Sequence, residues 1–190
     1  TATVVVPANA ALGIFTNTTS TVTADAGGIP VSASAASADM EIGFLAFDKA
    51  FLDSVIPGST VELEFSITNP DPANPATGIG FTDDLDAVLP GLTAVGLPVP
   101  DVCGAGSLLD GTSILTLSGG SLAPSATCVF TAAVLIPSGS QPGSYTNITS
   151  VLAATVAGTP VAGDAGSAAS DDLQVVAAAD AIPVLDSRGI

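Results

Sequence analysis

Hydrophobic and polar residues alternate in several short stretches of this chain. In VELEFSI, Val61, Leu63, Phe65 and Ile67 fall on one face and the glutamates on the other. This two-residue period is typical of a strand with one face in a core. TCVFTAAVLIP, SILTLSGG and TATVVVP follow the same pattern, and each is closed by Pro or Gly turn signals. The pattern predicts an all-β fold, an antiparallel β-sandwich rather than a parallel α/β sheet.

A repeat within the sequence sets the expected boundaries. GIFTNTTSTV (13–22) and GSYTNITSVL (143–152) share their Gly, Thr, Asn and Ser positions in register. After an insertion in the second copy, ADMEI also aligns with DDLQV. Segments that recur in register indicate copies of one structural unit. We therefore predict that 1–39 are the closing strands of a preceding or strand-exchanged repeat, 40–177 a complete sandwich, and 178–190 a C-terminal tail.

Four motifs resemble the repeats of Ig-like domains in long bacterial surface proteins: PGSTVELEFSITNP, FTDDL…LPGLT, C…LSGGSLAPSATCVFTAAV and PGSYTNITS. The resemblance covers about residues 40–177, with 1–39 as the end of a preceding unit. It implies an Ig-like β-sandwich plus an N-terminal half repeat, an exported protein, and a stalk, adhesin or other cell-surface role. It does not imply an enzyme.

The C-terminal tail carries a second resemblance. IPVLDSRG is similar to the start of the IPTLSEWG-type sorting segment of exported bacterial proteins, through Ile182, Pro183, Leu185 and Gly189. In that signal a membrane-spanning helix and basic residues follow, whereas here the sequence ends at Ile190. We interpret the tail as a truncated sorting segment.

Charge narrows the classes of partner. The chain has 190 residues, with 2 basic residues against 18 acidic ones and a formal net charge of −16 at pH 7. Binding to nucleic acid or to an anionic membrane surface depends on Lys and Arg, so neither is expected. No apolar run approaches the ~20 residues that a membrane span needs. Small and β-branched residues with little charge favour an extracellular location, and the resemblance implies the surface of a bacterial cell.

The two cysteines, Cys103 and Cys128, are accompanied by no histidine. Two thiols alone rarely form a zinc site, so they are either free or joined in a disulfide. An extracellular location favours the disulfide. Closing this loop would stabilise the fold by about 3.5 kcal/mol on the chain-entropy account.

The sequence offers little for catalysis or metal binding. Without histidine, Ser-His-Asp and Cys-His sites are excluded. LLDGTS has a passing likeness to the active-site strand of aspartic proteases, but Asp110-Gly111 fits a hairpin turn better. Thr1 could be considered as an N-terminal nucleophile. Its counterpart in the repeat, Thr131, lies inside a predicted strand, so Thr1 is expected to be a strand residue instead. The carboxylates of TDDLD (82–86) lack the spacing of a calcium loop, which favours a solvated, acidic strand end. We expect no enzyme, no metal and no cofactor.

Lys49 is the only lysine, and alternation in FDKAF places it on the same face as Phe47 and Phe51. An unpaired ammonium in a core is costly, so the side chain snorkels outward, pairs with a buried acid, or loses its charge covalently. Several bacterial surface Ig-like domains join a first-strand Lys to a last-strand Asn as an isopeptide, with a protonated acid assisting. The resemblance makes Asn147 and Asp83 the candidate partners, and a snorkelling lysine is the simpler alternative.

Residues 1–39 cannot bury a core alone, because their strands expose apolar faces and open edges. We expect other copies of the chain to complete this half by strand addition, head to tail, in a homopolymer. The predicted function is that of a structural subunit of an extracellular filament or stalk. The alternatives are an adhesin that binds a glycan or protein, or a module of a longer repeat array. The predicted assembly segment comprises Val4, Val5, Val6, Ile14, Phe15 and Asn17.

Overall fold

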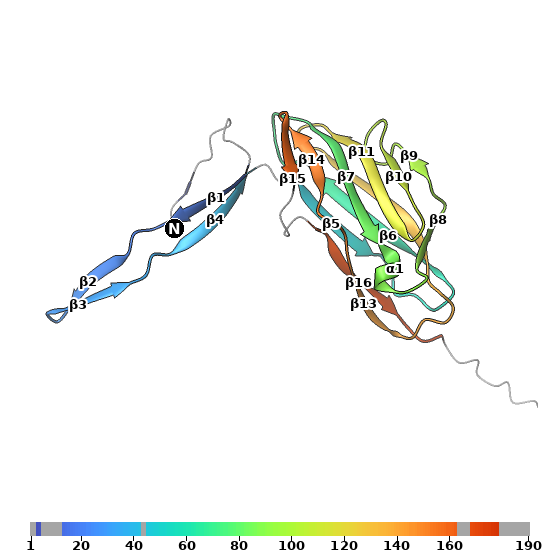
Figure 1. Cartoon of the computed structure of the whole chain (residues 1–190), viewed down its shortest axis with the longest axis horizontal. Helices are drawn as coiled ribbons and strands as arrows, with labels where there is room; N and C mark the ends of the chain where they lie inside the picture. Colours follow the sequence, from blue (N-terminus) through green and yellow to red (C-terminus); the bar gives the residue numbers. More distant parts are fainter. Residues whose placement is uncertain (1–2, 5–12, 43–44, 163–167, 179–190) are drawn as a thin grey trace, which may run out of the picture.

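The computed structural model describes residues 3–4, 13–42, 45–162 and 168–178. Nearly all of its regular structure is strand (Figure 1). The elements are β1 (Gly13–Thr18), β2 (Val22–Ala26), β3 (Ile29–Ala33), β4 (Ser37–Ile42), β5 (Ala46–Phe51), β6 (Thr60–Thr68), β7 (Ala76–Asp84), α1 (Leu85–Val88), β8 (Thr93–Val95), β9 (Val99–Pro100), β10 (Leu108–Asp110), β11 (Ile114–Leu122), β12 (Thr127–Leu135), β13 (Gly143–Ile148), β14 (Ala153–Val156), β15 (Thr159–Ala162) and β16 (Ser170–Val175).

Two antiparallel sheets form the layers of a sandwich. One sheet has the strand order β15-β14-β7-β11-β10-β9 and the other β5-β6-β12-β8. β16 of the β13–β16 pair lies beside β5, and Val55, in the segment after β5, bridges to Val175. We call β5 to β12 the body of the sandwich and β13 to β16 its closing strands. This arrangement confirms the predicted antiparallel β-sandwich.

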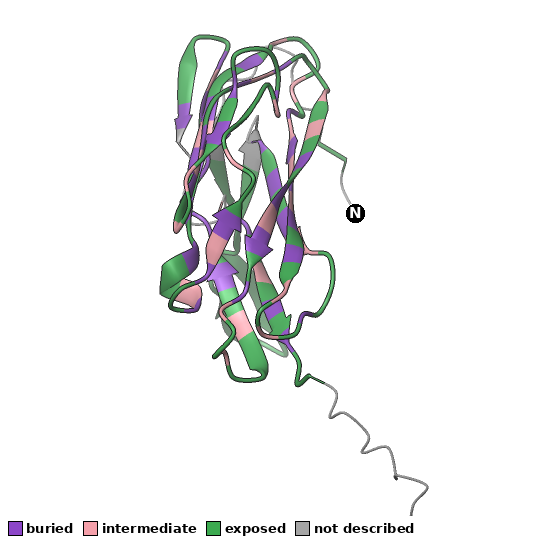
Figure 2. Ribbon diagram, turned by 90° about the vertical axis from the view of Figure 1, so that its right-hand side faces the viewer, coloured by how far each residue is buried: buried purple, intermediate pink, exposed green. Residues whose placement is uncertain are grey.

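The strands form where side chains alternate between core and solvent, as Figure 2 shows along the sandwich. On β6, Leu63, Phe65 and Ile67 are fully buried, while the residues between them face outward. Phe81 of the opposite sheet packs against Phe65 with ring centroids 4.9 Å apart, and against Phe47 at 4.7 Å. Aromatic pairs at such distances add to the stabilisation that comes from buried area. The two sheets therefore meet around a phenylalanine cluster.

Cys103 and Cys128 form the predicted disulfide, with their Cα atoms 5.4 Å apart. Cys103 lies between β9 and β10 and Cys128 lies on β12, so the bond joins the two sheets. The Asp110-Gly111 pair belongs to the β10–β11 hairpin, as expected. Gly111 has φ +113, and a Cβ there would overlap the Ile114 carbonyl oxygen, so the turn requires glycine.

β1 to β4 pair only among themselves in the described part of the chain, β1 with β4 and β2 with β3. We call this unit, 13–42, the ribbon. Every residue from Phe15 to Met40 is exposed. The expected strand at TATVVVP is not seen in the two residues of it that are described, Thr3 and Val4, which lie outside any strand. Its other residues, including Val5 and Val6, lie outside the described ranges, as does the sorting-like segment from Ile182.

The ribbon repeats the register of the closing strands. Phe15 lies opposite Met40, as Tyr145 lies opposite Leu173. The two pairs stand at equivalent places in the aligned segments. The Thr16 hydroxyl donates to Asp39 at 2.6 Å, and Thr146 donates to Asp172 at the same distance. The β2–β3 and β14–β15 hairpins also share one register, with Ala24 opposite Val31 and Ala154 opposite Val161.

No helix in the described ranges combines the length and apolarity that crossing a membrane requires.

Replacing both Cys103 and Cys128 with alanine is expected to lower the free energy of unfolding by about 3.5 kcal/mol, because the unfolded chain regains the entropy of an open loop. Urea unfolding of the variant and of the oxidised and reduced wild type measures this. The reduced wild type should match the variant. An unchanged midpoint after reduction would contradict the prediction.

Candidate functional site

Three polar side chains from different parts of the sandwich meet in its interior. Lys49 comes from β5 in one sheet, Asp83 from β7 in the other, and Asn147 from β13 of the closing strands. Each points inward because it continues the alternation of its strand, after Phe47, Phe81 and Tyr145 respectively. The structure therefore brings together the three residues that the sequence named as candidates for an isopeptide site.

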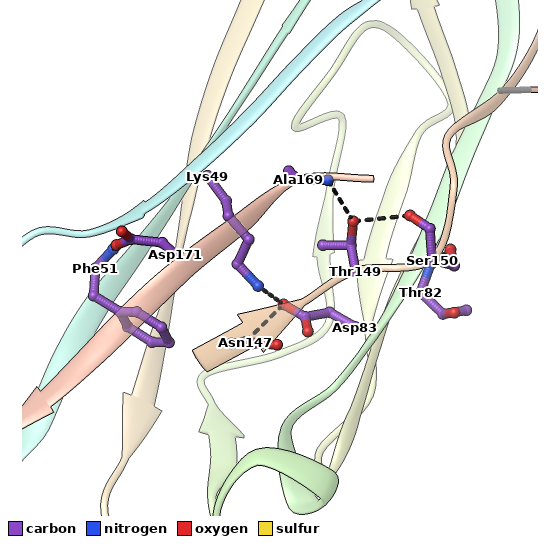
Figure 3. A network of polar contacts seen from close by, with 9 residues as sticks. All are labelled: Lys49, Phe51, Thr82, Asp83, Asn147, Thr149, Ser150, Ala169 and Asp171. Carbon is purple, nitrogen blue, oxygen red and sulfur yellow. Dashed lines mark hydrogen bonds and ion pairs between the residues drawn. The ribbon is translucent and has the colours of Figure 1, made fainter. Parts of the chain in front are cut away.

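The contacts converge on one oxygen atom. Lys49 Nζ donates to Asp83 Oδ2 at 2.7 Å, and Asn147 Nδ2 donates to the same Oδ2 at 3.2 Å (Figure 3). The side chains of Lys49 and Asp83 are both 0% exposed, and Asn147 is 0% exposed as a residue. Lys49 thus pairs with a buried acid and does not snorkel. Its nitrogen and the Asn147 amide are neighbours because both bind one carboxylate oxygen.

The surroundings of the Lys49 nitrogen lower its affinity for a proton. It lies 5.6 Å from the Phe65 ring centroid and 5.9 Å from that of Phe51. Burial lowers the pKa of Lys49, because desolvation outweighs the attraction of Asp83. The buried, aromatic surroundings therefore disfavour the charged form of this amine.

Two oxygens of the site lack partners among the described residues. They are Asp83 Oδ1 and Asn147 Oδ1, both buried. Two acceptors cannot satisfy each other, and a buried acceptor without a donor costs about 1–3 kcal/mol. The site thus holds two unsatisfied acceptors beside the Lys49 amine and the Asn147 carboxamide.

Several hydrogen bonds that the sequence did not reveal hold this site in place (Figure 3). Thr149 accepts from the Ala169 backbone N–H at 3.0 Å. Ser150 Oγ accepts from the Thr82 N–H at 2.9 Å and thereby fastens the end of β13 to β7. Asp171 accepts from the Phe51 N–H at 2.7 Å. Thr149 and Ser150 belong to the TNITS copy of the repeat. The recurrence of this segment was the sequence signal that could have identified them as structurally important.

One expectation for this region is wrong for one residue, while Asp84 and Asp86 are exposed as expected. TDDLD was expected to be a solvated acidic strand end, but Asp83 is fully buried because the alternation of β7 continues to its last residues. Asp84 instead caps α1, accepting from the Ala87 N–H at 3.1 Å. Asp86 accepts from the Gly91 N–H at 2.7 Å. The three carboxylates therefore have different roles: Asp83 accepts from Lys49 and Asn147, Asp84 caps α1, and Asp86 accepts from a backbone N–H.

The described members of the assembly segment lie apart from this site, in or before the ribbon. Val4 is 73% exposed and Phe15 is 41% exposed. Asn17 is exposed on β1, and Ile14 stands on the same strand opposite Glu41. The exposed apolar side chains of Val4 and Phe15 are the surface that a partner would have to cover.

The match to a known family falls on the sandwich. Residues 46–175 match the family described as "Domain of unknown function (DUF7933)". The chain belongs to this DUF7933 family. The matched region runs from β5 to β16, so both the body and the closing strands are inside it, and so are all three residues of the buried site.

Two solved structures show a distant likeness. The solution NMR structure of the CARDB domain of PF1109 from Pyrococcus furiosus is 19% identical, with a TM-score of 0.36, over 72% of this chain and 98% of that chain. The crystal structure of the same domain in complex with di-metal ions is 18% identical, with a TM-score of 0.36, over 70% of this chain and 89% of that chain. No curated protein matches the chain.

Removing Asp83 should leave the Lys49 amine buried without a partner, which costs about 3–5 kcal/mol. The comparison is best made in an Asn147→Ala background, where no bond between Lys49 and Asn147 can form. There, Asp83→Ala is expected to lower the free energy of unfolding by that amount. The combined change Lys49→Met with Asp83→Leu should restore most of it. Chemical denaturation measures both, and a loss below ~1 kcal/mol for Asp83→Ala would contradict the buried pair.

Proposed function

We propose that this chain is a structural element of an extracellular stalk or filament, in which Ig-like sandwiches follow one another head to tail. In this proposal the ribbon supplies the closing strands of a neighbouring sandwich. The observation that carries it is the shared register: the ribbon pairs its strands as β13 to β16 do, down to equivalent Thr–Asp bonds. A segment built as closing strands fits a body that lacks them.

The exposed face of the ribbon supports this proposal. Val31 and Met40 are 46% and 38% exposed, whereas their counterparts Val161 and Leu173 are 8% and 0% exposed. A two-stranded ribbon without a core is marginally stable in water. Each large apolar side chain that becomes fully buried contributes about 1.5–3 kcal/mol. Docking as closing strands would cover this face.

The neighbour needs an open position. The described residues contain one body but two sets of closing strands, and the closing strands already occupy that body. If another copy took the ribbon in exchange, it would bury Met40 but uncover Leu173, with little net gain in buried area. A homopolymer of unaltered copies therefore stays a prediction. The neighbour that the ribbon fits better is a sandwich body without closing strands of its own, because no buried side chain has to be uncovered there.

The extracellular location is part of the proposal. The Cys103–Cys128 disulfide supports it, since such bonds persist in oxidising compartments. The acidic excess, 18 acidic against 2 basic residues, fits a surface that repels copies except where shapes match.

A covalent clamp within the sandwich completes the proposal. The neutral Lys49 amine attacks Cγ of Asn147, the new C–N bond forms, and the bond to Nδ2 breaks. Asp83 relays the proton that the amine loses to the leaving NH2 group, which departs as ammonia. Asp83 returns to its starting state. Because Lys49 lies on the first strand of the body and Asn147 on the first closing strand, the amide would prevent the intervening chain from extending under tension.

Intact mass spectrometry of the purified, denatured chain tests the clamp. The wild type should be lighter than its sequence mass by one ammonia, while Lys49→Met and Asn147→Ala should show their full sequence masses. Digestion should yield one branched peptide that joins Lys49 to Asn147. A wild type of full sequence mass would remove the clamp from the proposal.

The docking of the ribbon can be tested with the full chain. Leu173→Asp is made together with Asn147→Ala, so that no amide fastens β13 to Lys49; it places a charge at a fully buried position of β16 and should unseat the closing strands. The vacated body then takes the ribbon of the next copy, and the variant should form ordered, protease-resistant fibres in electron microscopy. Fibres from the wild type as well would support the homopolymer.

Two further changes provide matched controls for that experiment. Met40→Asp lies on the ribbon face whose counterpart, Leu173, is buried, and it should abolish the fibres. Thr18→Asp adds the same charge on the opposite face, where the counterpart Ile148 is 60% exposed, and it should leave them intact. Amorphous aggregation of Leu173→Asp with Asn147→Ala, or equal behaviour of the two control variants, would overturn the proposal.

A further inference from the structure

We infer that the ribbon carries a covalent acceptor of its own, Asn17, which forms an amide with the lysine of the sandwich that the ribbon completes. This inference rests on the proposed docking of the ribbon and adds a chemical outcome to it. It assigns to Asn17 the role of a link between neighbouring subunits.

The first observation is the place of Asn17 on β1. It stands opposite Ala38, at the register position where Asn147 stands opposite Asp171. Alternation puts it on the same face as Phe15, as Asn147 shares a face with Tyr145. The ribbon thus presents a carboxamide at the point that faces Lys49 in the finished sandwich.

The second observation is that the hydrogen bonds around this position are also repeated. The Ala36 N–H donates to Thr19 Oγ1 at 2.9 Å, and the Thr19 N–H donates to the Ala36 carbonyl at 2.8 Å. In the sandwich, Thr149 and Ala169 make the same two bonds, both at 3.0 Å. These bonds set the backbone two residues beyond the asparagine, so the strand reaches a body with Asn17 already aimed inward.

The third observation is that Asn17 has no structural work within the ribbon. It is exposed, and no hydrogen bond of its side chain is found within the described ranges. Asparagine is also disfavoured in strands. Its side chain gains a partner only in a docked ribbon, beside an acid and a lysine placed as Asp83 and Lys49 are here.

The ribbon differs from the closing strands at one nearby position. Ala38 replaces Asp171, whose carboxylate accepts from the Phe51 N–H and attracts Lys49. A docked ribbon would therefore bring one negative charge fewer toward the lysine. Less attraction for the ammonium form favours the neutral amine that attacks a carboxamide.

The reaction follows the same balance as the intramolecular one. The amine nitrogen forms a bond to Cγ of Asn17, the bond from Cγ to Nδ2 breaks, and one ammonia leaves per link. The acid relays the proton and is regenerated, so no oxidant or energy source is consumed. In water the lysine is charged and the amide is hydrated, so the bond forms only after docking has buried both groups.

Copies of this chain provide the test, because Lys49 is its only lysine. Asn147→Ala with Leu173→Asp removes the internal acceptor and unseats the closing strands. This variant should assemble and then give an SDS-resistant ladder, lighter by one ammonia per link. Tandem mass spectrometry should find a peptide that joins Lys49 of one copy to Asn17 of the next. Adding Asn17→Ala should abolish the ladder, whereas adding Thr18→Ala should preserve it.

The outcomes separate this inference from the proposed function. Fibres that form in both the Asn17 and Thr18 variants, with no ladder in either, would overturn the covalent link and leave the docking proposal standing. A ladder that survives Asn17→Ala would also overturn the assignment of Asn17. Absence of any ordered assembly would overturn the docking proposal, and this inference with it.

Discussion

The contact between Lys49 and Asp83 constrains the rest of the sandwich, because it joins the two sheets through a buried ion pair. Neither partner can be left alone in the core without a cost of about 3–5 kcal/mol. A slip of one residue in either strand would turn its charged group outward and leave the other one unpaired. The pair therefore enforces one register for β5 and β7, which the phenylalanine cluster alone would enforce only through packing.

Asn147 extends this constraint to the closing strands. Its amide binds the same Asp83 oxygen as Lys49, and the residues after it fasten β13 to its neighbours through Thr149 and Ser150. The TNITS segment thus combines a buried carboxamide with the bonds that position it. The same segment recurs as TNTTS in the ribbon, together with the Thr–Ala bonds that position the asparagine. This shared role explains why these residues match more closely than the apolar residues around them.

Alternation along the sequence predicted that Lys49 points inward, because a two-residue period is local information. It did not decide between a snorkelling and a paired Lys49, since that depends on sheet order, which brings β5, β7 and β13 together across the chain. The error at Asp83 arose because its polar neighbours Thr82, Asp84 and Asp86 mask the alternation. The short helix α1 was missed because four residues carry no helical period. The disulfide was predictable because the chain has only two cysteines.

The ribbon and the closing strands place nearly the same segment in two environments. In the sandwich its apolar face is covered by a core, and in the ribbon it meets water, although the backbone pairing is the same. Backbone hydrogen bonds thus set the shape of the segment, and the body supplies the stability. Association between chains of charge −16 works against mutual repulsion, so a noncovalent joint would weaken at low salt. A buried amide, as proposed for Asn17, would hold the joint regardless of that repulsion, and this is the physical advantage that the proposed link offers over a noncovalent one.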